Sequence, residues 1–142
     1  NPDESRTQQR LREIKINTLT VKSPVILTGD VMAQAACEML VQHGASEAYV
    51  IDNEKRLLGR VDAVALLEIS DGASCDKPVT CFLSKPKVVL QEQMNLLDAA
   101  AILQSSTDNG IPVVDDEVSQ QFVGVVDKNV LMQAVLRAAT DT

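Results

Sequence analysis

Two aspartates hold equivalent places in the chain, each directly after a short apolar run and directly before a helix-forming segment. They are Asp62 and Asp127. A carboxylate at a helix start accepts hydrogen bonds from the free backbone amides of the first turn, and carboxylate oxygens are also the ligands that hard divalent cations prefer. The pair therefore predicts either two helix caps or a site for a divalent cation.

The other residues with chemical potential are isolated. His43 is the only histidine, at the end of an apolar helical pattern, and no cysteine or carboxylate stands at ligand spacing from it. The run Ser105–Asp108 has no paired base, so we interpret it as a loop that ends a helix. Cys37, Cys75 and Cys81 lack metal-type spacing. We expect no catalytic residue and no metal site.

Composition narrows the class of partner. The 142 residues carry a net charge of −7, and only 2% of them are aromatic. Such a surface repels phosphate backbones and offers few rings for base stacking, so we expect no nucleic acid and no anionic membrane as a partner. A hydrophobic content of 45% with 23% charged residues predicts a folded domain.

The cellular setting is also read from the sequence. Cys37 sits in an apolar helical pattern, where a reduced thiol is expected, and this indicates a reducing cytoplasm. No stretch approaches the roughly 18 apolar residues of a membrane span, so we expect no membrane insertion of this chain. Because the chain starts without Met, we expect it to be a piece of a longer protein.

The strongest pattern is an internal repeat. Val25–Leu27 is matched in the second half by Val88–Leu90, and Asp52 is matched by Asp115 at the same spacing. Farther on, Asp62 is matched by Asp127 at a slightly wider spacing. Two residues are therefore inserted before Phe122, and an insertion at that place belongs to a turn.

Each half predicts the order strand, helix, strand, strand, helix. In the first half Asp30 is expected to cap a helix that Gly44 closes, and in the second half Asn95 is expected to cap one. The expected strands are 25–27, 48–51, 57–61, 88–90, 111–114 and 122–126, and the expected helices follow residues 30, 63, 95 and 129.

The domain boundaries follow from the repeat and from a polar stretch between its halves. We expect an N-terminal linker or docked helix at 1–17, a first repeat at 18–70, a linker at 71–80 and a second repeat at 81–142. A half of about 50 residues has little interior of its own, so we expect the two pseudo-symmetric halves to pack through their sheets. We also expect apolar helix surfaces such as Leu131, Val135 and Leu136 to pair two copies in a homodimer.

This pattern resembles the tandem cystathionine-beta-synthase (CBS) family, or Bateman module, over roughly residues 18–139. A strand ending in Val-Ile-Asp or Val-Val-Asp, a turn, then two apolar residues, Gly, any residue and Val, recurs at Tyr49–Asp52 with Leu58–Val61 and at Pro112–Asp115 with Val123–Val126. The resemblance implies an α/β (α+β) fold of two β-α-β-β-α repeats and a regulatory domain, with adenosine nucleotides bound in the cleft between repeats.

The resemblance also allows a residue-by-residue test. The family pattern Gly-x-x-Ser/Thr-x-x-Asp supplies a hydroxyl to phosphate and a carboxylate to ribose. Counted from Gly59, these positions hold Asp62 and Ala65, and counted from Gly124 they hold Asp127 and Val130. A carboxylate about 4 Å from a phosphate oxygen costs on the order of 4 kcal/mol at an effective dielectric near 20, about a thousandfold in affinity. Binding of ATP in the usual pose is therefore disfavoured unless Mg²⁺ bridges the charges.

The ligand hypothesis is accordingly an adenosine nucleotide (AMP, ADP or ATP), with or without Mg²⁺. The ligand-binding candidates combine apolar strand residues that would contact the adenine with the two aspartates: Val25, Ile26, Asp62, Val88, Ile111, Pro112 and Asp127. We expect replacement of Ile111 by Asp to abolish binding without unfolding the chain.

Three functions remain open. The first is a non-catalytic regulatory module at the cytoplasmic end of a membrane transport protein, of the chloride channel or exchanger type. The second is the corresponding module of a betaine-type ABC transporter ATPase. The third is a purely structural dimerisation module without a nucleotide site. All three follow from the resemblance, and none is an enzyme.

Overall fold

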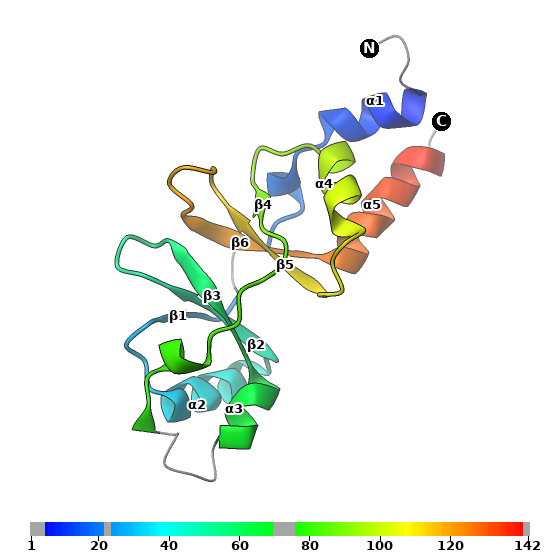
Figure 1. Ribbon diagram of the computed structural model, residues 1–142. Helices are drawn as coiled ribbons and strands as arrows, with labels where there is room; N and C mark the ends of the chain where they lie inside the picture. Colours follow the sequence, from blue (N-terminus) through cyan, green and yellow to red (C-terminus); the bar gives the residue numbers. More distant parts are fainter. Residues whose placement is uncertain (1–4, 22–23, 70–75, 141–142) are drawn as a thin grey trace. The chain divides into compact units, whose positions relative to one another are not determined.

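The computed structural model describes residues 5–21, 24–69 and 76–140 (Figure 1). The chain forms two compact units. Unit 1 combines Asn1–Lys22 with Lys87–Thr142, and unit 2 is the continuous stretch Ser23–Pro86. Each unit carries one three-stranded sheet with helices packed against it, so the α+β class predicted from the repeat is confirmed.

Unit 2 contains the first repeat. Its sheet has the order β1-β2-β3, with β1 parallel and β3 antiparallel to β2. The elements in chain order are β1 (Ile26–Thr28), α2 (Ala33–His43), β2 (Glu47–Ile51), β3 (Leu57–Asp62), α3 (Ala63–Ile69) and the 3-10 turn η3 (Val79–Phe82).

Unit 1 repeats this plan with the sheet order β4-β5-β6. Its elements in chain order are α1 (Arg6–Glu13), the 3-10 turn η1 (Ile16–Thr18), β4 (Leu90–Gln91), α4 (Leu96–Leu103), β5 (Gly110–Val114), β6 (Phe122–Asp127) and α5 (Lys128–Thr140). The expected N-terminal helix is present and docked: Ser5 and Gln8 form a capping box at its start, and Leu11 is buried.

The two sheets have the same register. Leu27 pairs with Val50 in unit 2, and Leu90 pairs with Val113 in unit 1, so the second pair reproduces the first at the spacing of the sequence repeat. The hairpin registers shift at the same place, after Val50 and after Val113. The duplication predicted from the sequence is therefore a structural duplication.

The helix ends test the capping predictions. Gly44 ends α2 with φ of 60°, and the Asn95 side chain accepts a hydrogen bond from the amide of Asp98 at 2.9 Å. Both predictions are confirmed. The prediction for Asp30 is wrong, because α2 begins after Met32 and Asp30 accepts from the Thr28 hydroxyl instead. The amide of Ala33 donates to the carbonyl of Lys77 at 2.9 Å, so a distant backbone segment takes part of the cap's role.

Each unit has its own apolar core between its sheet and its helices. In unit 2 the fully enclosed residues include Ala36, Ala48, Val50, Val61, Leu66 and Val79. In unit 1 they include Ile16, Leu90, Leu96, Ala99, Val113, Val126 and Leu131. Aliphatic residues fill both cores, as the near absence of aromatic residues requires.

The expected dimer face needs a correction at Leu131. This side chain is fully enclosed in the core of unit 1, and Val135 packs against that core, whereas Leu136 is 56% exposed. The stripe predicted as outward-facing is therefore wrong for Leu131: this side of α5 covers the sheet. The exposed large apolar residues of α5 are Val130, Met132 and Leu136.

Each repeat is preceded in the chain by a segment that the sequence pattern did not show as part of the repeat. We name residues 14–21 leader 1 and residues 77–84 leader 2. In unit 1 the amide of Ile16 donates to Met94 at 2.8 Å, and in unit 2 the amide of Val79 donates to Val31 at 2.7 Å. Ile16 and Val79 are separated by the same spacing as the repeated strands, and both have 0% exposure. Leader 1 thus completes unit 1, although it directly precedes unit 2 in the chain.

The far ends of the leaders pair with the last strand of each sheet. Val21 exchanges two backbone hydrogen bonds with Val125 of β6, at 2.8 and 3.0 Å, and Ser84 exchanges two with Arg60 of β3, at 2.8 and 2.9 Å. The neighbouring glycines permit this approach. A Cβ on Gly59 would lie 2.9 Å from the carbonyl oxygen of Ser84, and one on Gly124 would collide with that of Val21. The glycine of each repeated motif therefore makes room for a leader.

Candidate functional site

The two candidate aspartates lie at the same structural position, where the last strand of each sheet passes into a helix. Asp127 caps α5: its Oδ1 accepts from the amides of Asn129 at 2.8 Å and Val130 at 3.2 Å. The capping interpretation is therefore confirmed for Asp127. One oxygen of the exposed carboxylate accepts both cap bonds, which orients the group at the start of the helix.

Asp62 lies in a different electrostatic setting. Its Oδ1 is 3.8 Å from Nε of Arg60, and the same nitrogen is 3.5 Å from Oε2 of Glu47. The side chain of Arg60 is only 9% exposed. Because Arg60 stands between two carboxylates in a mostly buried place, the charge of Asp62 is partly balanced within unit 2 itself.

Tyr49 completes this polar group on one face of the sheet. Its hydroxyl donates to Oε1 of Glu47 at 3.0 Å, and Arg60 is its direct neighbour across the strand pair. Burial, followed by the charge of Glu47, raises the pKa of the Tyr49 phenol, so the hydroxyl stays protonated and remains a donor. We call Glu47, Tyr49, Arg60 and Asp62 the polar group of unit 2.

The sequence-based candidates did not include Glu47, Tyr49 and Arg60. The signal was present as spacing: Glu47 and Tyr49 stand two apart on β2, Arg60 and Asp62 two apart on β3, and period-2 spacing places each pair on one sheet face. The matching positions of unit 1 hold Gly110, Pro112, Val125 and Asp127, so the repeat does not preserve the polar group.

The apolar candidates are mostly core residues. Val25, Val88 and Ile111 are 9%, 7% and 1% exposed within the cores of their own units, and Pro112 is buried. Ile26 differs, with 39% exposure. An aspartate at Ile111 would place a charge in the core, so the burial of this residue leads us to expect that Ile111→Asp destabilises unit 1, contrary to the expectation from the sequence. The contact of these residues with a ligand stays a prediction.

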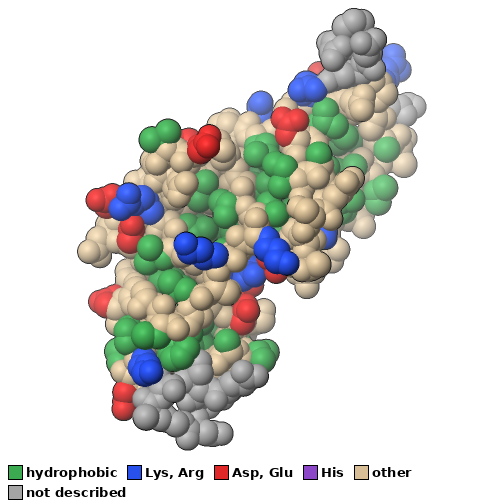
Figure 2. Space-filling model, viewed as in Figure 1, with side chains coloured by type: hydrophobic (Ala, Val, Ile, Leu, Met, Phe, Trp, Pro, Cys, Tyr) green, Lys and Arg blue, Asp and Glu red, His purple; other side chains and the backbone are tan. Residues whose placement is uncertain are grey.

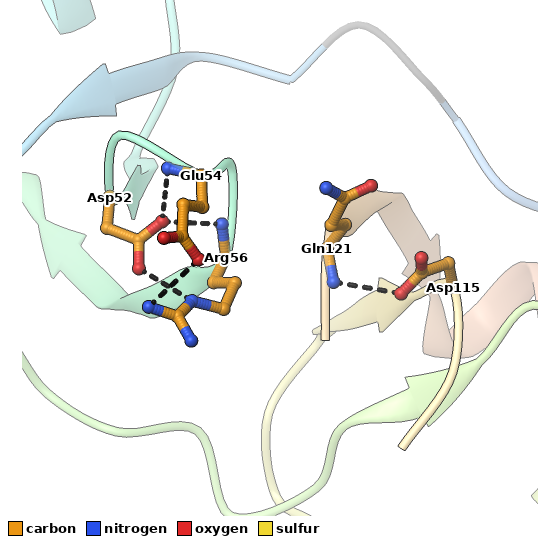
Figure 3. A network of polar contacts seen from close by, with 5 residues as sticks. All are labelled: Asp52, Glu54, Arg56, Asp115 and Gln121. Carbon is orange, nitrogen blue, oxygen red and sulfur yellow. Dashed lines mark hydrogen bonds and ion pairs between the residues drawn. The ribbon is translucent and has the colours of Figure 1, made fainter. Parts of the chain in front are cut away.

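The hairpin turns that precede β3 and β6 are built around equivalent aspartates (Figure 3). Oδ1 of Asp52 accepts from the amide of Arg56 at 2.9 Å, and Oδ1 of Asp115 accepts from the amide of Gln121 at 2.8 Å. The first bond spans four residues and the second spans six, which places the two-residue insertion in the turn, as predicted. Lys55 and Gln120, just before the donors, both have positive φ, at 66° and 52°.

These turn carboxylates are held in the ionised form by their donors. Hydrogen bonds from the Arg56 backbone and side chain lower the pKa of Asp52, and the Ser119 hydroxyl, 2.6 Å from Oδ2, lowers the pKa of Asp115. Beside the first turn, a hollow of about 370 Å³ is lined by Gly29, Asp30, Ile51, Asp52, Asn53 and Leu58. All its lining residues belong to unit 2.

The remaining candidates have structural roles. Nδ1 of His43 lies 2.8 Å from the carbonyl oxygen of Met39, one turn back in α2. Burial, and then Glu38, raises the pKa of the Cys37 thiol, which disfavours a reactive thiolate. Among residues 5–21, 24–69 and 76–140, no three His, Cys, Asp or Glu side chains come together as metal ligands. Across the same ranges, no helix has the length and apolar character of a bilayer span.

Comparison with known proteins accounts for the duplication. Residues 79–137 match the CBS domain family. The CBS pair domain of a putative Mg²⁺ transporter from Shewanella oneidensis MR-1 superposes with a TM-score of 0.73 at 20% identity, covering 96% of this chain and 80% of that one. The chain folds as a CBS domain pair.

Two further proteins are similar to this chain. The structure of CBSX2 in complex with AMP matches with a TM-score of 0.71 at 20% identity, covering 89% of this chain and 98% of that one. The A-adding tRNA nucleotidyltransferase of Aquifex aeolicus is 28% identical over 123 residues, which is 87% of this chain and 14% of that protein. The CBS pair thus spans about a seventh of the length of this curated relative.

Proposed function

We propose that this CBS pair is a regulatory module that senses an adenosine nucleotide on behalf of a larger protein and performs no catalysis itself. The duplicated fold carries the proposal, and a solved CBS pair in complex with AMP supports the ligand class. The side chains that could act as nucleophile or base make local hydrogen bonds at helix ends instead. They are His43, Ser105 and Asp127.

The two aspartates set the expected ligand order. Asp62 and Asp127 stand where the family pattern has a hydroxyl, so each added phosphate meets a carboxylate. We expect AMP to bind more tightly than ADP, and ADP more tightly than ATP, with Mg²⁺ recovering part of the difference by bridging the charges. The ligand contacts proposed on the strands are Val25, Ile26, Val88, Ile111 and Pro112, of which Ile26 has the most accessible side chain.

Isothermal titration calorimetry tests this order. AMP, ADP, ATP and S-adenosylmethionine would each be titrated into the protein with and without Mg²⁺, together with a thermal melt at saturating ligand. Heat and a raised melting temperature with AMP support the proposal. No heat and no shift with any of the four would remove the nucleotide sensor and leave the structural dimerisation module.

A matched pair of variants tests the role of Asp127. In Asp127→Ser a hydroxyl still caps α5 but the charge is gone, so we expect ATP affinity to rise by about tenfold or more. The control Asp116→Ser removes the same charge from an exposed turn, where Asp116 accepts from the amides of Val118 and Ser119. Equal ATP affinity in both variants would place the phosphates away from Asp127.

The larger protein has two candidates. A cytoplasmic module of a membrane transport protein is supported by the likeness to the CBS pair of a putative Mg²⁺ transporter. A module of a tRNA nucleotidyltransferase-type protein is supported by 28% identity over most of the chain. Sequencing the gene around this CBS pair separates them, because the first requires adjacent membrane spans and the second an adjacent nucleotidyltransferase domain.

We further propose that two copies pair through helices. The exposed apolar residues Val130, Met132 and Leu136 of α5 support this, and Figure 2 shows exposed apolar side chains at several separate places on one face. Light scattering after size exclusion would show a dimer that Leu136→Lys converts to a monomer. A wild-type monomer at every concentration tested would refute the pairing.

A further inference from the structure

Leader 1 and α1 belong to unit 1, yet the chain continues from them directly into unit 2. The Val21–Val125 bridge occupies one end of leader 1, and α1, which packs against α4 and α5, is attached to its other end. Leader 2, in contrast, directly follows α3 of the unit that it completes. Each unit is thus completed by the leader of the other repeat, but only in unit 1 is that leader far along the chain from the rest of the unit.

The contacts of leader 1 reach the structural centre of unit 1. Ile16 lies in the core with 0% exposure, and Leu11 of α1 joins the same core with 5%. Leu96 is the first residue of α4, and its amide donates a hydrogen bond to the carbonyl of Ile14 at 2.8 Å. Displacement of this segment would open the core, free the first amide of α4 and leave β6 without its bridge.

From this arrangement we propose that α1 and leader 1 form a displaceable latch, through which an event at the N-terminal helix changes unit 1 and leaves unit 2 intact. The biological role of the latch rests on the proposed regulatory function. In that role, the latch is the route by which the module and an attached protein influence each other. The coupling between α1 and unit 1 needs no ligand. A test of this coupling is therefore independent of the calorimetric test of nucleotide binding.

The position of α1 suits such a latch. Its start is stabilised by the Ser5–Gln8 capping box, so the helix has its own local stability, but Leu11 is its only buried side chain. A helix held by one apolar anchor can leave its docking surface as a unit. Leader 1, with its inward Ile16 and the Val21–Val125 bridge, transmits that departure to β6.

Native-state hydrogen exchange followed by NMR reads this coupling in the full chain. The amide of Val125, which donates to Val21, reports on unit 1, and the amide of Arg60, which donates to Ser84, is its direct counterpart in unit 2. In Leu11→Asp we expect exchange of the Val125 and Ile16 amides to accelerate at least tenfold, while Arg60 stays within twofold of wild type. Leu11→Ala is a milder change. It should also accelerate exchange at Val125 and Ile16 more than at Arg60, but by a smaller factor than Leu11→Asp.

Two controls come from the repeat itself. Val41→Asp puts the same charge on an 80% exposed site of α2 and should change neither reporter. Gly124→Ala perturbs the latch at its β6 end, because the added methyl group pushes against the Val21 carbonyl. We expect it to accelerate hydrogen exchange at the amide of Val125 and at the amides of α1. Its counterpart Gly59→Ala should accelerate Arg60 and spare α1.

Two outcomes would overturn the latch. In the first, Leu11→Asp accelerates exchange at the amides of α1 while the amides of Val125 and Ile16 keep their protection. Release of α1 would then have no effect on the rest of unit 1. If Val125 and Arg60 lose protection by the same factor, the two units respond together and the latch has no selectivity.

Discussion

Unit 2 is one continuous piece of chain, whereas unit 1 is assembled from two pieces separated by the whole of unit 2. Their sheets share the same order and register, and their leaders make the same hydrogen bonds. The difference lies in chain connectivity. Closing a longer loop costs more conformational entropy, by about 0.6 kcal/mol for each doubling of its length. The comparison teaches that a duplicated fold can have one locally completed half and one half completed from a distance.

The second difference between the units is polar. Unit 2 places four polar side chains on its sheet, of which Tyr49 and Arg60 are buried, and unit 1 has glycine, proline, valine and aspartate at the same positions. The repeats therefore keep the same backbone architecture and differ in the side chains on this face of the sheet. The predictions below probe each difference, from the largest effect to the smallest.

The largest effect is expected from the two enclosed leader residues. Ile16→Ala removes a fully buried side chain and should lower the free energy of unfolding by about 2–5 kcal/mol, with the loss of exchange protection confined to unit 1. Val79→Ala should cost less, because fewer atoms are removed, and should act on unit 2. Urea unfolding combined with hydrogen exchange measures both. If either variant loosened both units alike, the cores would form one cooperative structure.

The polar group of unit 2 should give the next effect. Arg60→Ala leaves Glu47 without its mostly buried cation, and we expect a loss of about 1.5–3 kcal/mol in thermal or urea unfolding. The exposed turn residue Arg56 is the control. The Arg56 side chain is 51% exposed and its ion pair with Asp52 is screened by solvent, so Arg56→Ala should cost clearly less than Arg60→Ala. Equal costs would mean that the polar group contributes no more than a surface pair.

The helix caps differ between the units by a smaller amount. Asn95 caps α4 with its side chain, so Asn95→Ala should cost about 1 kcal/mol in urea unfolding. Asp30, near the start of α2, caps no helix, and Asp30→Ala should stay within about 0.5 kcal/mol of wild type. A larger cost for Asp30 would show that its bond with Thr28 matters more than a cap.

The smallest effect concerns pH. The folded pKa values of Asp52 and Asp115 lie below their ordinary values, so both carboxylates stabilise the fold above pH about 4, and this contribution disappears as the pH falls through the folded pKa values. Asp52→Asn and Asp115→Asn should each make the melting temperature less dependent on pH in this acidic range. NMR titration of the side-chain carboxyls of Asp52 and Asp115 gives the two pKa values directly. Values at or above the ordinary pKa of an aspartate would contradict the prediction.

The sequence was most informative where both repeats keep similar residues. The constant spacing between the matched strands reappears as the equal register of the two sheets, and the inserted pair before Phe122 predicted the longer turn around Asp115. Gly44 and Asn95 were readable because each acts on its own neighbours in the chain. Local chemistry and repeated patterns were therefore sufficient for the order of the repeated strands and helices.

Long-range partners were not readable from the sequence. Ile16 matches the similar Val79, but Val21 matches the dissimilar Ser84, and one matched pair is too little to reveal a repeat. Their partners Met94 and Val125 stand far along the chain, beyond any periodic pattern. The same limit explains the wrong prediction for Asp30, because the carbonyl of Lys77 determines where α2 begins. The polar group of unit 2 was missed because it joins residues of two strands.

The separation of leader 1 from its partners has a consequence during translation. Val125 leaves the ribosome about a hundred residues after Val21, which takes about 5 to 20 seconds at ordinary elongation rates. Until that interval ends, the core that Leu11 and Ile16 join is incomplete, because Val126, Leu131 and Ala138 are not yet synthesised. All residues of unit 2 are synthesised within the interval, so the sequence of unit 2 is complete before that of unit 1.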